Sequence, residues 1–143
     1  MSGVDDEPLA ALRRTAELYA IGADRRDPAL WRDVLAEDCV ISGPGFTLEG
    51  IAAAEGALAM LERDFRRTRH LVHQQHAVVA GENAHGETYC TADHLLRDAD
   101  SVLRWHIRYQ DQRQRREGNW QFTRRELTVD WEETLPVTAK GAA

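Results

Sequence analysis

Apolar residues near the start of the chain recur at intervals of three and four positions, which is the spacing of one face of an α-helix. The pattern predicts an amphipathic helix that ends near Arg26 and is formed by Leu9, Leu12, Ala16, Tyr19, Ala20 and Ala23. Asp27 and Pro28 predict the start of a second short helix, because aspartate can cap free backbone N–H groups and proline fits the first turn. A further run at helical spacing, from Ile51 to Phe65, predicts a third helix over most of residues 51–66.

The pattern changes after residue 66, where β-branched and aromatic residues alternate with polar ones between turn signals. Such alternation is typical of β-strands. We predict strands over residues 70–80, 84–96, 102–115 and 120–131, and two shorter ones at 39–41 and 46–48. Three helices followed by a long meander predict an α+β fold, in which a cone-shaped, curved antiparallel or mixed sheet wraps around a long helix, with two further N-terminal helices.

The length of 143 residues corresponds to about one domain. We assign residues 1–132 to that domain and residues 133–143 to a C-terminal tail. No apolar run approaches the ~20 residues that span a bilayer. The net charge of −6 disfavours a nucleic-acid partner, because phosphate binding depends on clustered positive charge. The acidic N-terminus lacks the layout of a secretion signal, so we expect a cytoplasmic protein without a membrane partner.

The six histidines and two cysteines do not have the spacing of a metal site. On a regular strand His70 and His76 would share one face, whereas His73 would lie on the other, so the three could not converge. Cys39 and Cys90 stand alone among strand-like residues, which favours small buried side chains over a disulfide. We therefore expect neither a metal nor another cofactor.

Four segments of the chain resemble one known family: Tyr19 to Asp27, Thr68-Arg69-His70, Tyr109-Gln110-Asp111 and Arg116 to Arg125. They are similar to the SnoaL-like branch of the nuclear-transport-factor-2-like superfamily over roughly residues 8 to 132. This branch includes dehydratases, a dehydrochlorinase, isomerases and polyketide cyclases. The resemblance implies the same cone-shaped fold, with an active site in its interior.

The resemblance implies catalytic roles for Asp24 and His70. His70 lies where the dehydratase-like members carry their basic histidine, and Asp24 lies at their helix-end aspartate. Histidine suits a general base because its ordinary pKa of about 6.5 is near the working pH. The alternatives are a surface ion pair of Asp24 with Arg25, Arg26 or Arg32, and an exposed strand position for His70.

Further site residues follow from the same resemblance. Arg125 matches an arginine near the departing group, and a salt bridge to Glu126 or Asp111 is its alternative role. Tyr19 has the spacing from Asp24 of a tyrosine that assists the substrate oxygen, although core packing would also explain it. His94, Trp105 and Tyr109 are the candidates for substrate binding.

The leading hypothesis is a cofactor-independent lyase of the dehydratase type, which removes a proton from a small hydrophobic or cyclic hydroxy-carbonyl substrate. An isomerase or polyketide cyclase would use the same base. A non-catalytic ligand-binding or assembly module, like the small subunit of a ring dioxygenase, would need no such pair. We also expect a homodimer or homotrimer, because Trp105, Tyr109 and Trp131 on one sheet surface would leave a large apolar patch on a monomer.

Overall fold

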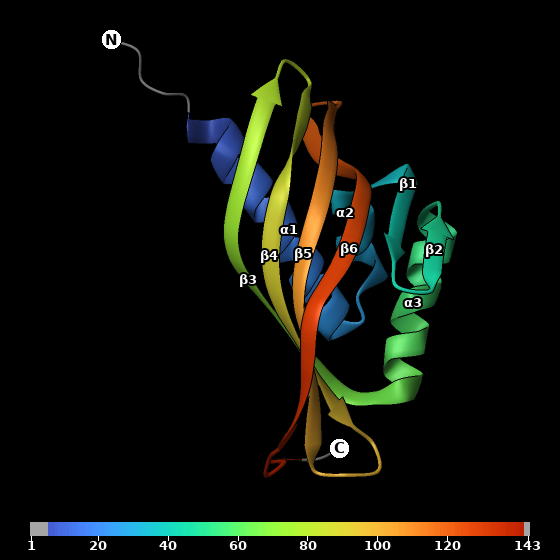
Figure 1. The fold of residues 1–143 in the computed structure, drawn as a ribbon. Helices are drawn as coiled ribbons and strands as arrows, with labels where there is room; N and C mark the ends of the chain where they lie inside the picture. The colour runs from blue at the N-terminus through green and yellow to red at the C-terminus, as the bar shows by residue number, and fades with distance from the viewer. Residues whose placement is uncertain (1–5, 142–143) are drawn as a thin grey trace.

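The computed structural model describes residues 6–141, which form three helices and one six-stranded sheet (Figure 1). The helices are α1 (Asp6–Arg25), α2 (Pro28–Val34) and α3 (Ile51–Asp64). The strands are β1 (Leu35–Gly43), β2 (Phe46–Glu49), β3 (Phe65–Ala80), β4 (Asn83–Leu96), β5 (Ser101–Arg116) and β6 (Asn119–Pro136). This arrangement confirms the predicted α+β fold.

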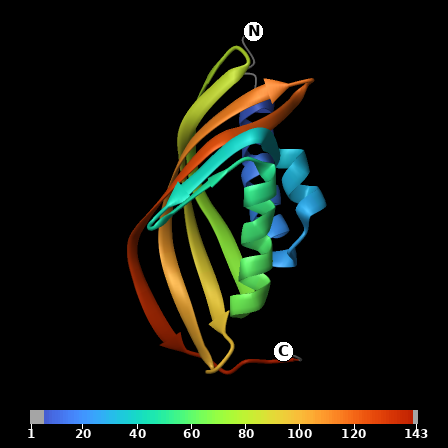
Figure 2. The ribbon, with the colours of Figure 1, turned by 90° about the vertical axis from the view of Figure 1, so that its right-hand side faces the viewer.

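The strands follow the order β2-β1-β6-β5-β4-β3, and the sheet curves without closing. All neighbouring strands are antiparallel except β1 and β6, which are parallel. The three helices lie on one side of the curved sheet (Figure 2). The main core lies between these two layers, where buried residues of α1, α2 and α3 pack against the inner face of the sheet.

The turn between α1 and α2 has the predicted chemistry. Asp27 Oδ1 accepts hydrogen bonds from the backbone N–H groups of Ala29 and Leu30, at 3.0 and 3.2 Å, and Pro28 occupies the first turn. Arg26 has a φ of +53°, in the left-handed region in which helices commonly end. The reversal is therefore tight, and it leaves the end of α1 beside β3.

A bulge in β3 corrects one prediction. The pairing of β3 with β4 shifts register between Val72 and Gln75, so one extra residue reverses the alternation of side chains. His70 is partly buried, whereas His73 and His76 are both exposed. The predicted shared face of His70 and His76 is therefore wrong.

Within residues 6–141, no group of three or more His, Cys, Asp or Glu side chains is arranged to hold a metal ion.

A second bulge corrects the predicted apolar patch. The pairing of β5 with β6 shifts between His106 and Ile107, which pair with Trp131 and Val129. Tyr109 is buried and Trp105 is partly buried against the core, but Trp131 is 62% exposed and stacks on His106, with ring centroids 4.7 Å apart. The three aromatic residues do not share one surface.

The last strand is longer than predicted. Residues 133–136, which we had assigned to the tail, pair with residues 101–104 of β5. β5 begins at Ser101, directly after the turn that follows β4, so β6 has a partner strand as far as Pro136. No helix in the described part of the chain is both long and apolar enough to cross a membrane.

Candidate active site

A cavity of about 370 Å³ lies between α3, the aromatic side chains of α1 and α2, and the inner face of the sheet. Its wall is almost entirely apolar, and it contains no Asp, Glu, Lys or Arg side chain. The lining residues are Tyr19, Ala23, Trp31, Ile41, Phe46, Leu48, Ala53, Gly56, Ala57, Met60, Leu61, His70, Ala92, Trp105, Ile107, Tyr109 and Leu127. His70 is the one residue of this wall that can accept a proton near neutral pH.

Asp24 in the last turn of α1 binds His70 of β3 through both carboxylate oxygens. Oδ1 lies 2.7 Å from Nδ1 of His70, and Oδ2 accepts the backbone N–H of His70 at 2.8 Å. The Thr68 hydroxyl donates a third hydrogen bond to Oδ1 at 3.0 Å. The two side chains are only 19% and 10% exposed, so water competes little for these hydrogen bonds.

The carboxylate fixes the orientation of the imidazole of His70. An ionised carboxylate can only accept hydrogen bonds, so Nδ1 of His70 carries the proton that is shared with Asp24. Nε2 then holds the lone pair, and the ring belongs to the cavity wall. A histidine whose free ring nitrogen faces such a cavity would have the arrangement that proton abstraction needs.

His94 of β4 places a second imidazole beside this pair. Its Nδ1–H donates to the carbonyl oxygen of Leu103 at 3.0 Å, and its ring centroid lies 6.3 Å from that of His70. Burial lowers the pKa of His94 below its usual value of 6.5, with a smaller contribution from His70. His94 contacts the aromatic ring of Trp105, but it does not itself line the cavity.

Two tyrosines lie in the wall, and their pKa values are raised. Tyr19 stacks on Trp31 with centroids 4.7 Å apart and meets Tyr109 edge to face at 6.1 Å. Burial raises the pKa of Tyr19 to about 12, and it raises the pKa of Tyr109 as well. Both phenols therefore stay protonated at neutral pH and can act as hydrogen-bond donors.

Arg125 of β6 lies behind these tyrosines and does not line the cavity. Its guanidinium binds Asp111 through two nitrogens, at 2.7 and 3.2 Å, and stands 3.6 Å from the ring centroid of Tyr109. Burial is the largest single effect and lowers the pKa of Arg125, but the attraction and hydrogen bonds of Asp111, together with smaller contributions from Tyr109 and Tyr19, leave the pKa raised. Thr88 also donates to Asp111, at 2.7 Å, so the carboxylate accepts three hydrogen bonds inside the protein.

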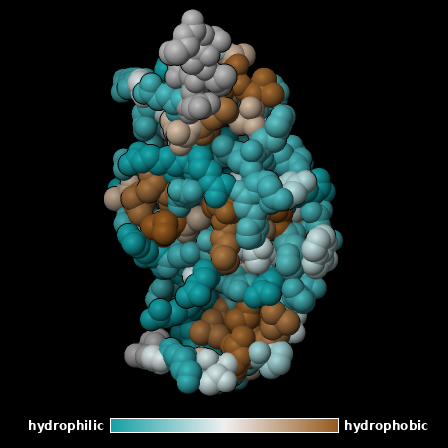
Figure 3. Space-filling model, turned by 90° about the vertical axis from the view of Figure 1, so that its left-hand side faces the viewer, coloured by the Kyte–Doolittle hydropathy of each residue, from teal (hydrophilic) through white to brown (hydrophobic). Residues whose placement is uncertain are grey.

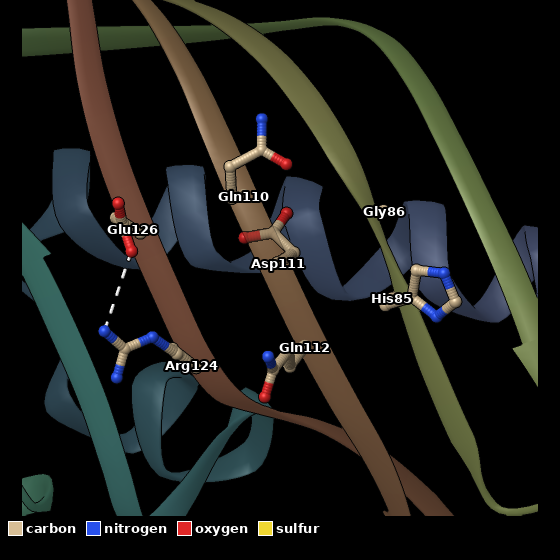
Figure 4. A pocket seen from close by; sticks show the side chains of 7 residues that line it. All are labelled: His85, Gly86, Gln110, Asp111, Gln112, Arg124 and Glu126. Atoms are coloured by element: carbon tan, nitrogen blue, oxygen red, sulfur yellow. Dashed lines mark ion pairs between the residues drawn. The ribbon is translucent and has the colours of Figure 1, made fainter.

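A shallow depression on the sheet is lined by polar residues of β4, β5 and β6 (Figure 4). Within it, Arg124 and Glu126 form an ion pair with a separation of 3.6 Å. The side chains of His85, Gln110 and Gln112 do not converge on a common point (Figure 4). The depression lacks the paired acid and base found at the apolar cavity.

The structure brings most of the predicted site residues together. Asp24 and His70 are hydrogen-bonded, and Tyr19, Trp105 and Tyr109 line the same cavity. Sequence reasoning missed Thr68 as a partner of Asp24 and missed the contribution of α3 to the wall. A signal for α3 was present, because its small and apolar lining residues recur at helical spacing: Ala53, Gly56, Ala57, Met60 and Leu61.

The chain is similar to one known family and to several solved structures. A family profile described as SnoaL-like domain matches residues 7–126. A protein from Novosphingobium aromaticivorans DSM 12444, provisionally named a scytalone dehydratase, is 24% identical with a TM-score of 0.85, over 97% of this chain and 95% of that one. A LinA-type3 hexachlorocyclohexane dehydrochlorinase from Novosphingobium barchaimii LL02 is 16% identical with a TM-score of 0.83, over 96% of each chain.

A third similar structure, also from Novosphingobium aromaticivorans, is provisionally named an aromatic ring hydroxylase. It is 19% identical with a TM-score of 0.81, over 94% of this chain and 96% of that one. No curated protein matches the chain. At these identities the similarity establishes the fold, and the different names of the three structures show why the reaction has to be argued from the site.

Proposed function

The chain belongs to the SnoaL-like domain family, and from that premise we propose that it is a cofactor-independent lyase of the dehydratase type. The observation that carries the proposal is the 2.7 Å contact between Asp24 and Nδ1 of His70, with the imidazole in the wall of an apolar cavity. A dehydratase needs a base of this kind, because the reaction begins with the loss of a proton from carbon.

In the proposed reaction, Nε2 of His70 takes a proton from a carbon next to a carbonyl group. The electrons of the C–H bond form a C=C bond, while the C–O bond at the next carbon breaks. The departing oxygen takes the proton back from Nε2 of His70, so that it leaves as water and the neutral imidazole is regenerated. Asp24 stabilises the imidazolium that forms. Tyr19 supplies the hydrogen bond to the departing oxygen, since its phenol stays protonated.

The cavity wall supports a substrate without charge. A carboxylate or phosphate would find no cationic partner among the lining residues and would lose its hydration, which is costly in an apolar site. The indole N–H groups of Trp31 and Trp105 already donate to the Tyr19 carbonyl and to Glu132. We therefore propose a neutral, hydrophobic or cyclic hydroxy-ketone that forms its polar contacts with His70, Tyr19 and Tyr109.

Arg125 enters this proposal as an indirect contributor. A direct contact with the departing group would require the rings of Tyr19 or Tyr109 to move aside, because the guanidinium packs against both, at 4.5 and 3.6 Å from their centroids. We propose that Arg125 holds the two phenols in position. His94 is proposed to shape the substrate site through its contact with Trp105.

Two observations favour an enzyme over a binding module. A module that only holds a ligand or another protein would not need a carboxylate in direct contact with a histidine, and its histidine could point away from the cavity. Here the two side chains touch, and His70 lines the cavity.

The test begins with a substrate search, in which native mass spectrometry identifies the neutral hydroxy-ketones that the protein retains. Asp24→Asn and His70→Ala should each lower kcat by about 10²-fold or more, the range for a disabled acid–base group. The double variant should be little worse than the poorer single variant, because the residues act as a unit. His73→Ala, an exposed histidine on the same strand, is the matched control. Near wild-type turnover by both single variants, or losses that multiply, would sink the proposal.

We also propose that the chain assembles as a homodimer or homotrimer. The support is a set of exposed apolar side chains on the sheet, Leu71, Tyr89 and Trp131. Apolar patches interrupt the hydrophilic surface in the view from the side of β3 (Figure 3). Sedimentation velocity should show an oligomer that Trp131→Glu weakens, and a monomer at high micromolar concentration would contradict the proposal.

A further inference from the structure

Arg26 directs its guanidinium toward the residues that hold Asp24 and His70, the pair called the dyad below. It is the first residue after α1, and its Nη1 donates to the carbonyl oxygen of Ala23 at 2.7 Å and to Oγ1 of Thr68 at 2.6 Å. The side chain is only 13% exposed, and Nε has no hydrogen-bond partner within residues 6–141, with the carboxylate of Glu62 3.5 Å away. A cation that is mostly withdrawn from water with incomplete hydrogen bonding needs a reason beyond surface solubility.

The hydrogen bonds around Thr68 can run in only one direction. A hydroxyl has one proton to donate and two lone pairs, whereas a guanidinium can only donate. Because Arg26 donates to Oγ1 of Thr68, that oxygen accepts on this side and its single proton is free to point to Oδ1 of Asp24, at 3.0 Å. The chain of donors therefore runs from Arg26 through Thr68 to Asp24.

The direction of these hydrogen bonds affects which atom of the dyad carries the shared proton. Oδ1 of Asp24 accepts from Thr68 and faces Nδ1 of His70 at 2.7 Å, while Oδ2 accepts the backbone N–H of His70. Without a proton on Nδ1, the contact between Nδ1 and Oδ1 would need a proton on Oδ1, and that proton would compete with the one that Thr68 donates to the same oxygen. The shared proton then belongs to Nδ1 of His70, and Nε2 keeps its lone pair.

We infer that Arg26 and Thr68 are positioning residues that fix the tautomer of His70 by keeping the proton of the dyad off Asp24. The catalytic meaning of this inference rests on the proposed function, because a tautomer with a free Nε2 matters only if His70 acts as the base. The backbone hydrogen bond from His70 to Oδ2 is the same in both tautomers, so it cannot select between them. The selection comes from the Oδ1 side, where Thr68 lies.

The direct experiment is ¹⁵N NMR of histidine-labelled protein, which distinguishes a protonated from an unprotonated ring nitrogen and needs no substrate. In the wild type, His70 should be protonated at Nδ1 alone. Thr68→Val, which removes only the hydroxyl at nearly constant shape, and Arg26→Gln should each produce a measurable fraction with the proton on Nε2. Thr68→Ser should restore the wild-type spectrum.

Two controls keep this result interpretable. Arg25→Gln removes the neighbouring arginine, whose side chain is exposed, and should leave the spectrum of His70 unchanged. Asp24→Asn should disturb the tautomer more than any other variant, which shows that the measurement responds. If His70 keeps a single Nδ1–H tautomer in both Thr68→Val and Arg26→Gln, the inference is overturned. Arg26→Gln removes a hydrogen bond at the end of α1, so Thr68→Val decides alone if that variant fails to fold.

Kinetics separate this inference from the proposed function. With a verified substrate, Thr68→Val should lower kcat by about 10-fold and leave KM unchanged, the scale expected when a supporting hydrogen bond is lost. A changed tautomer together with full activity of the His70→Ala variant would leave the inference standing and refute the proposed function. An unchanged tautomer together with an inactive His70→Ala variant would refute the inference and leave the proposed function standing.

Discussion

Two carboxylates on the inner side of the protein approach a nitrogen to the same distance, 2.7 Å, but in different settings. Asp111 and Arg125 are almost completely buried, and the cation is permanent and bound through two nitrogens. Asp24 binds an imidazole that can gain and lose a proton and that borders the cavity. What separates the Asp24–His70 pair from the Asp111–Arg125 pair is that one of its partners can titrate and also borders a space in which a ligand fits.

The surroundings of Asp111 indicate a role in the stability of the folded protein. Arg113 is also buried, and burial lowers its pKa to about 10, while the charge of Asp111 opposes this shift. Asp111 is the one buried acid in the described part of the chain, so it balances two buried arginines. Removal of this carboxylate would leave both cations without a buried counter-charge.

The largest expected effect is therefore the loss of stability in Asp111→Asn. Breaking a buried ion pair by removing one partner costs about 3 to 5 kcal/mol, because the remaining charge stays buried. Urea denaturation should show this loss in the free energy of unfolding. Asp130→Asn, which breaks the exposed pair with Arg108, is the matched control and should change the midpoint little. Equal midpoints for the two variants would refute the assignment.

Asp24→Asn should lose less stability than Asp111→Asn, and its main effect should be on activity. We expect a loss of about 1.5 to 3 kcal/mol in the free energy of unfolding, the scale of a hydrogen bond to a charged group, beside the loss of activity described above. Both quantities can be measured on the same preparation. A variant that unfolds as readily as Asp111→Asn would give Asp24 a structural role and contradict the proposed catalytic one.

Two helical glycines differ in the same way, because one faces the cavity and the other is packed against a neighbouring side chain. A Cβ at Gly56 of α3 would meet nothing within 4 Å, and this residue lines the cavity. Alanine is favoured over glycine inside a helix by about 1 kcal/mol, so Gly56→Ala should raise the melting temperature while it weakens binding of the retained ligand. At Gly22 of α1 a Cβ would lie 2.5 Å from Cδ1 of Trp31, so Gly22→Ala should be destabilising. Tighter ligand binding by Gly56→Ala would show that this position does not limit the substrate.

The smallest expected effect is a pH dependence of stability that comes from His94. Burial lowers the pKa of His94 in the folded protein below its usual 6.5, so the unfolded chain binds more protons in mild acid. The free energy of unfolding should be highest above pH 6.5 and should fall as the pH drops below it. In His94→Asn, which keeps a donor toward the Leu103 carbonyl, this part of the slope should disappear. An unchanged slope would assign the acid sensitivity to other groups.

Local patterns predicted most of the secondary structure but not the faces of the long strands. The apolar run of α1 and the Asp27-Pro28 start signal depend on neighbouring residues, so sequence alone contains them. The bulges before Gln75 and at Trp131 depend on how a partner strand pairs, and simple alternation cannot include them.

The candidate site divides in the same way. The resemblance located Asp24 and His70 because both lie in recognisable segments, and the structure shows them in contact. The connection from Arg26 to Thr68 joins residues 42 positions apart and depends on the direction of a hydroxyl proton. No spacing rule predicts such a contact, and Arg26 looked like a surface partner of Asp24 until the fold was known.

The parallel pairing of β1 with β6 also has a consequence for the order of folding. β3 to β6 form hairpins with near neighbours in sequence, whereas β1 must wait for residues 122–126 of β6 before it joins the sheet. Contacts between distant segments form late, because closing a long loop costs entropy before it gains contacts. During synthesis, the β1–β2 hairpin, which carries Ile41, Phe46 and Leu48, therefore has no neighbour on its β1 side until β6 emerges, whereas Asp24 and His70 are already in the nascent chain. The contact between Asp24 and His70 can form early, but the cavity beside it is completed by the last strand.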